Sequence, residues 1–133
     1  MRAIQLAKGA LWAGCKLLED KFGDSVEAIT LAGAFGSHID TKYAMVLGLI
    51  PDCDLIKVRS AGNAAGTVAR MALLSKSSRA EIEHLVGQIE KIETAVEPDF
   101  QQYFVDAMAI PNKTDPYTNL QGVVTLPQRK EKK

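Results

Sequence analysis

The sequence predicts an α/β fold with few parallel strands and several covering helices. Two short apolar runs, at residues 28–32 and 55–58, have the length and β-branched content of buried strands. Helical patterns precede, separate and follow these runs, at residues 2–22, 40–48 and 63–74. The order helix, strand, helix, strand, helix requires parallel strands that are joined by right-handed crossovers.

The composition limits the chain to one hydrophobic core of ordinary size. It has 133 residues, of which 47% are hydrophobic, and 16 basic residues balance 16 acidic ones. A balanced charge gives no overall field that would attract nucleic acid, and the basic end at residues 128–133 is typical of a solvated terminus. No apolar run approaches the roughly 18 residues that a membrane helix needs. We therefore expect neither a nucleic-acid partner nor a membrane partner.

The two cysteines indicate a reducing compartment. Cys15 and Cys53 stand far apart, and the first residues carry charges where a secretory signal would be apolar. This pattern predicts reduced thiols and a cytoplasmic protein.

The first predicted helix, residues 2–22, has an apolar stripe. Its members recur at spacings of three and four, which predicts that they face the core: Ile4, Ala7, Leu11, Cys15, Leu18 and Phe22. Gly23 supplies a stop. Trp12 lies among polar positions, so we expect a tryptophan that is partly exposed, with contact to something outside this chain as the alternative.

Each predicted strand ends in a glycine-rich turn that leads into a helix. The first turn consists of Gly33, Ala34, Phe35, Gly36 and Ser37, and the second spans residues 62–66. A strand, a glycine turn and a helix in succession bring backbone N–H groups close to a phosphate or a flat ligand, although a plain tight turn has the same pattern.

Polar residues beside these turns have local explanations as well as functional ones. Asp40 or Thr41 and, in the second turn, Asn63 are of the residue types that cap helices. His38 follows the first turn, where it could hydrogen-bond a ligand or simply mark a helix entrance. From Asn63 to Leu74 the chain is almost entirely small or apolar, so we expect most of this helix to be covered.

The last third of the chain continues with helices and an extended tail. Ser78 and Glu81 have the spacing of a capping box, and the helix that follows has one apolar face, formed by Ile82, Leu85, Val86 and Ile89. Residues 91–96 have the pattern of a short edge strand, and Pro98 opens a further helix. We expect an extended tail from residue 111 onward, anchored by Tyr117, Leu120 and Val123.

The sequence predicts no catalytic centre and no metal site. It has no Walker lysine motif, no Ser/His/Asp set and no cluster of cysteines and histidines. Asp52 and Asp54 flank Cys53, but two carboxylates in a turn are common without a metal. Cys15 belongs to the apolar stripe and should be buried, whereas His84 should be solvated. Two strands are also few for a parallel sheet, so the sheet either pairs with another chain or belongs to a larger protein.

Seven short motifs, in this order, resemble the C-terminal part of the ASKHA-domain reductive activators of corrinoid proteins. The motifs are Gln5-Leu-Ala-Lys-Gly-Ala10, Leu31-Ala-Gly-Ala-Phe-Gly36, Leu47-Gly-Leu-Ile-Pro-Asp52, Gly62-Asn-Ala-Ala-Gly66, Ala72-Leu-Leu-Ser75, Pro98-Asp-Phe100 and Phe104-Val-Asp-Ala-Met108. Each motif is weak alone, and their order makes the resemblance specific.

The resemblance implies an ATP-dependent activator that returns an inactive cob(II)amide to cob(I)amide in a corrinoid methyltransferase system. In that family an N-terminal [2Fe–2S] ferredoxin domain supplies the electron. The C-terminal region has the actin-like fold, with ATP between two ribonuclease-H-like lobes. The implied partner is a corrinoid protein, and the implied cofactors are ATP and, in the preceding domain only, the [2Fe–2S] cluster.

The resemblance also assigns parts of this chain. Residues 1–110 resemble the last part of the second ASKHA lobe, and residues 111–133 form the tail. Gly33 to Ser37 resemble the adenosine motif, with Ala34 where the family usually has a second glycine. The first three strands of that lobe, the first lobe and the ferredoxin domain have no counterpart here, so we expect the chain alone to be inactive. The alternative is a non-catalytic interaction module that forms a homodimer through an open sheet edge.

Overall fold

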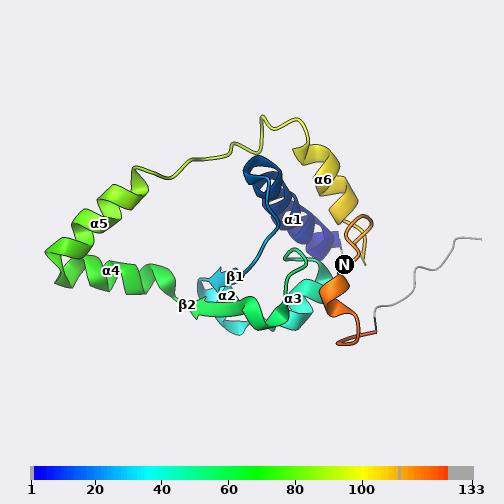
Figure 1. Cartoon of the computed structure of the whole chain (residues 1–133), viewed down its shortest axis with the longest axis horizontal. Coiled ribbons are helices and arrows are strands. Elements are labelled where there is room, and N and C mark those ends of the chain that lie inside the picture. The colour runs from blue at the N-terminus through cyan, green and yellow to red at the C-terminus, as the bar shows by residue number, and fades with distance from the viewer. Residues whose placement is uncertain (1, 111, 126–133) are drawn as a thin grey trace, which may run out of the picture.

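The computed structural model describes residues 2–110 and 112–125. The elements, in chain order, are α1 (Arg2–Phe22), β1 (Ile29–Ala32), α2 (Ala34–His38), α3 (Thr41–Leu47), η1 (Leu55–Lys57), β2 (Val58–Gly62), α4 (Ala64–Leu74), α5 (Lys76–Val86), α6 (Phe100–Ala107) and η2 (Thr118–Leu120). In Figure 1, α4 and α5 project from the rest of the chain as an arm, and residues 87–99 run back from its end towards α6. Of the helices in the described ranges, none is both long and apolar enough to cross a membrane.

The described residues contain a sheet of two parallel strands, as the order of elements predicts. Ile29 lies opposite Val58, and the register shifts between Leu31 and Ala32. α2 and α3 lie in the crossover between β1 and β2. The predicted α/β class with few parallel strands is confirmed.

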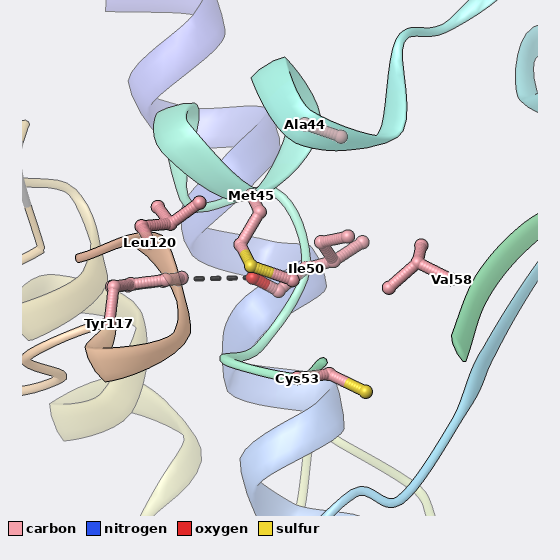
Figure 2. Close-up of a cluster of buried hydrophobic side chains, with 7 residues drawn as sticks. All are labelled: Ala44, Met45, Ile50, Cys53, Val58, Tyr117 and Leu120. Atoms are coloured by element: carbon pink, nitrogen blue, oxygen red, sulfur yellow. Dashed lines mark hydrogen bonds between the residues drawn. The ribbon is translucent and has the colours of Figure 1, made fainter. Parts of the chain in front are cut away.

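The main core lies beside the sheet and includes residues from the C-terminal segment. Figure 2 shows its seven buried members: Ala44, Met45, Ile50, Cys53, Val58, Tyr117 and Leu120. The hydroxyl of Tyr117 donates a hydrogen bond of 3.0 Å to the carbonyl oxygen of Ile50. Tyr117 and Leu120 are therefore the anchors that we expected, whereas Val123 is exposed.

The prediction for the buried face of α1 is wrong. α1 packs against α6 (Figure 1), and its buried residues are a different set: Lys8, Gly9, Trp12, Ala13 and Leu17. The predicted stripe is exposed at Ile4, Leu11, Leu18 and Phe22. Gly9 permits this packing, because a Cβ atom there would lie 3.0 Å from the backbone oxygen of Phe104.

Trp12 is buried rather than partly exposed. Only 6% of its surface is exposed, and its ring meets the ring of Tyr103 edge-on at 6.4 Å. Its indole Nε1 donates a hydrogen bond of 3.4 Å to Asp115. Its partners come from α6 and the C-terminal segment, which the local pattern around α1 does not reveal.

Three further local predictions differ from the structure. α5 begins at Lys76, where Ser75 is the N-cap and accepts a hydrogen bond from the Ser78 N–H at 3.2 Å, so the capping box at Ser78 is not the helix start. Residues 91–96 form no strand. No residue of α4 is buried, although the sequence predicts a covered helix; its main packing partner among the described residues is α5, which lies beside it on the arm.

Lys8 is an unusual residue among those that α1 buries, because its side chain ends in an ammonium group. Lys8 is fully buried, and its Nζ has no hydrogen-bond partner among the described residues. A Cβ atom at Gly48 would lie 3.0 Å from this Nζ and 3.2 Å from the hydroxyl oxygen of Tyr117, so Lys8 lies where α1, the end of α3 and the C-terminal segment meet. Burial lowers the pKa of Lys8 below its usual value, because desolvation disfavours the charged form.

We expect Lys8→Met to raise the free energy of unfolding by about 1–3 kcal/mol at neutral pH, because methionine fills similar space without a desolvated amine. The pKa of Lys8 is lower in the folded chain than in the unfolded chain. Between these two pKa values the unfolded chain binds more protons, so the native protein should gain stability as the pH rises towards about 10.4, the pKa of an unperturbed lysine. Urea unfolding at pH 7 and near pH 10 measures the stability change caused by Lys8→Met and the rise in stability of the native protein with pH.

The variant should lose this part of the pH dependence. Lys76→Met, at an exposed position of α5, is the matched control and should change neither quantity appreciably. Destabilisation by Lys8→Met at neutral pH would show instead that the ammonium has a partner in solution.

Candidate functional site

The two glycine turns lie together at the carboxyl ends of β1 and β2. The backbone N–H of Gly33 donates a hydrogen bond of 2.7 Å to the carbonyl oxygen of Gly62. Ser37 reaches across the same junction, since a Cβ atom at Gly62 would lie 3.6 Å from its Oγ. The carboxyl edge of a parallel sheet is where ligands of open α/β proteins bind.

The first turn leads directly into α2, a short helix over residues for which the sequence predicts only a turn. Gly33 has a φ of 98°, a backbone conformation that favours glycine, and gives no side-chain cap to α2. The backbone of Ala34 and Phe35 therefore begins a helix whose first N–H groups have no side-chain cap. Ala34 and Ser37 are exposed at this turn.

Gly36 has a packing role. It is buried, and a Cβ atom at this position would lie 2.9 Å from both the carbonyl carbon and the carbonyl oxygen of Leu31. Such a contact is closer than a Cβ atom tolerates, so Gly36 allows α2 to lie directly on β1. Of the five residues predicted for the adenosine motif, Gly36 is thus explained by the fold alone.

The second turn supplies the N-cap of α4, the helix that follows it. Gly62 has a φ of 59°, and the side chain of Asn63 accepts a hydrogen bond of 3.0 Å from the N–H of Gly66. A Cβ atom at Gly66 would lie 2.7 Å from the Asn63 amide nitrogen, so glycine leaves room for this cap. The predicted role of Asn63 is confirmed, as is that of Asp40, which accepts from the N–H of Tyr43 at 3.1 Å.

The two turns together offer backbone N–H groups and small side chains on an open edge. Such a surface can contact a phosphate or lie against a flat ring. His38, at the end of α2, is exposed beside it.

The other candidate residues have structural partners. Asp52 accepts hydrogen bonds from the Thr118 hydroxyl at 2.9 Å and from the Asn119 N–H at 3.2 Å, so it holds the C-terminal segment. Asp54 caps η1 by accepting from the Ile56 N–H at 3.0 Å. Within the described ranges, no group of three His, Cys, Asp or Glu side chains could hold a metal ion.

The two thiols are free, and neither lies at the glycine turns. Cys53 is buried, and its Sγ donates to the carbonyl oxygen of Glu27 at 3.4 Å. Cys15 is half-buried on α1, although the sequence predicts a buried residue. Burial raises the pKa of both thiols, which makes them poor nucleophiles at neutral pH.

Comparison with known proteins places this geometry in a family. A family model described as the C-terminal domain of RACo, the ASKHA domain, matches residues 1–121. The corrinoid activation enzyme RamQ of Eubacterium limosum is 40% identical over an alignment of 112 residues, and the match covers 81% of this chain and 19% of that enzyme. A solved structure, a reductive activator for corrinoid, iron-sulfur protein, superposes with a TM-score of 0.75 at 32% identity and covers 83% of this chain and 18% of its own.

The family match and the superposition confirm the predicted partial actin-like architecture. This chain spans about a fifth of the length of the relatives that it matches. It belongs to the family of C-terminal ASKHA domains of the corrinoid reductive activators.

Proposed function

We propose that this chain acts as the C-terminal part of an ATP-dependent reductive activator, which returns the cob(II)amide of a corrinoid methyl-transfer protein to cob(I)amide. The family and the names of the two relatives support a role in corrinoid activation. The observation that carries the nucleotide part of the proposal is the direct contact between the two glycine turns, through the bond from Gly33 to Gly62. Gly33, Ala34, Phe35, Gly36 and Ser37 form the proposed adenosine side.

The residues present fit an adenosine group. The uncapped N–H groups at the start of α2 offer donors, and Ala34 is exposed with a side chain small enough for a flat ring to approach. ATP, when bound, would supply the free energy that makes an uphill reduction possible. The chain's own contribution is to bind and orient the nucleoside at the carboxyl edge of its sheet, so that closure of a hinge biases the corrinoid partner towards its reducible state.

Replacing the matched region of the Eubacterium limosum enzyme with residues 1–121 of this chain tests the proposal. We expect the chimera to reduce its corrinoid protein in an ATP-dependent manner, followed by the absorbance of the corrinoid. Ala34→Asp in the chimera should raise the dissociation constant for ATP about tenfold or more, because a carboxylate at this edge repels phosphates and fills the space beside the ring.

Aspartate in the first turn of a helix is otherwise favourable, so this variant should keep its fold. Ser77→Asp, also at an exposed position in the first turn of a helix but on the arm, is the matched control and should bind ATP normally. A folded chimera whose ATP affinity is unchanged by Ala34→Asp would contradict the proposed site. A folded chimera that binds ATP but reduces no corrinoid would contradict the proposed function.

A further inference from the structure

The C-terminal segment, residues 112–125, is held on the rest of the chain by a small number of side chains. Tyr117 and Leu120 insert into the core and are almost completely buried (Figure 2). Asp52 accepts hydrogen bonds from two residues of the segment. The regular structure within the segment is the short helix η2, so these side-chain contacts keep it in place. Segments that depend on few contacts open at a low cost in free energy.

The backbone of the segment is strained at Tyr117. This residue has a φ of 47° and a ψ of 60°, and it is the one non-glycine residue in the described ranges with a positive φ. The left-handed conformation is unfavourable for a bulky side chain. Burial of the ring and the hydrogen bond from its hydroxyl to Ile50 hold Tyr117 in this conformation, which would relax if the segment left the core.

A second unfavourable feature lies at the same point. The Nζ of Lys8 is buried without a hydrogen-bond partner among the described residues, and both this atom and the Tyr117 hydroxyl lie against Gly48. Asn112, at the start of the segment, also buries an amide nitrogen without a partner in this part of the chain. A buried ammonium is far more costly than a buried neutral amine. Departure of Tyr117 would return the Lys8 side chain to water.

The charged groups on the elements around Lys8 are engaged with other partners. These pairs are Asp52 with Asn119, Asp106 of α6 with Lys113, Asp115 with Trp12, Lys16 of α1 with Asp20, and Lys42 of α3 with the ring of Tyr43. Burial lowers the pKa of Lys8, and no carboxylate of the described residues opposes this shift. Burial raises the pKa of Tyr117, so its hydroxyl stays neutral where Lys8 titrates.

We propose that residues 112–125 form a strap that docks on α1 and the core when the Lys8 amine is neutral and is released when this amine carries a proton. Apolar burial favours the docked strap, whereas the backbone strain at Tyr117 and the charge on Lys8 favour release. Because docking disfavours the proton, a rise in pH shifts the equilibrium towards the docked strap. Lys8 is enclosed by residues of this chain, and the switch does not depend on nucleotide binding or corrinoid activation.

The fluorescence of Trp12 reports the position of the strap. Trp12 is the single tryptophan of the chain, lies one helical turn from Lys8 and donates a hydrogen bond to Asp115 of the strap. Quenching by acrylamide, an uncharged molecule, measures how accessible its ring is to solvent. We expect the quenching constant of the full chain to be about twofold or more larger at pH 7 than near pH 10, because release uncovers the indole.

Three variants calibrate this measurement. Lys8→Met carries no charge to bury, so its quenching should be low at both pH values. Tyr117→Ala removes the side chain that anchors the strap, so its quenching should be high at both. Lys76→Met, at an exposed position of α5, is the matched control for loss of a lysine and should keep the pH dependence of the unchanged chain.

Far-UV circular dichroism separates release of the strap from unfolding. The spectrum of the unchanged chain should be the same at both pH values, because the helices and strands remain. Equal quenching at the two pH values would overturn the proposal. It would also be overturned if Lys8→Met kept the pH dependence, or if the change in quenching came with a loss of helix signal.

Discussion

Trp12→Ala is expected to lower the free energy of unfolding by about 3–5 kcal/mol, the usual cost of truncating a buried aromatic residue. Trp12 is 6% exposed, and its ring lies between α1 and α6, edge-on to Tyr103. The substitution also removes the hydrogen bond from the indole to Asp115, and thereby one link between α1 and the C-terminal segment. A loss of this size is a large part of the total stability of a small domain. Urea denaturation followed by circular dichroism measures it.

Leu11→Ala supplies the comparison on the adjoining face of the same helix. Leu11 belongs to the apolar stripe of the sequence but is 55% exposed in the folded chain. Its truncation should cost less than about 1 kcal/mol, as is usual for exposed positions. If Leu11→Ala were the more damaging of the two substitutions, the face of α1 that is buried in solution would be the one that the sequence pattern predicts.

Gly36→Val is expected to destabilise the chain by about 1–3 kcal/mol or more, because side-chain atoms must enter a closely packed contact. The Cβ atom would lie 2.9 Å from the Leu31 backbone, which cannot rotate away as a side chain can. α2 would have to move off β1, and the bond from Gly33 to Gly62 would be strained with it. The thermal or urea midpoint should fall accordingly.

Gly14→Ala is the matched control for the glycine substitution. Gly14 also lies in a helix, α1, but a Cβ atom there would have nothing within 4 Å. Its replacement should stabilise the chain by about 0.5–1 kcal/mol through helix propensity alone. Equal effects of the two substitutions would show that Gly36 does not contact β1. Gly36→Val acts on the fold, so loss of nucleotide binding in this variant would not identify a ligand contact. Ala34→Asp lies at an exposed position, and its effect on nucleotide binding can identify such a contact.

The features that the sequence determined by itself are those that depend on neighbouring residues. The extent of α1, the two parallel strands and the caps at Asp40 and Asn63 follow from periodicity, β-branched content and side-chain hydrogen bonds within one turn. The start of α5 shows the limit of local patterns. Ser75 and Ser78 are both good caps only three residues apart, and the earlier one is used. The glycine turns were visible in the sequence, but their contact with each other was not.

Only the tertiary structure decided which side of α1 is buried. An apolar stripe shows that a helix can be covered, but it does not identify the element that covers it. That element is α6, about a hundred positions away, and it packs where Gly9 allows close approach and where Trp12 meets Tyr103. The stripe with Leu11 and Cys15 instead borders an apolar hollow beside β1. The same physical reason applies to Tyr117 and Leu120: burial depends on contacts between distant segments, which no local spacing encodes.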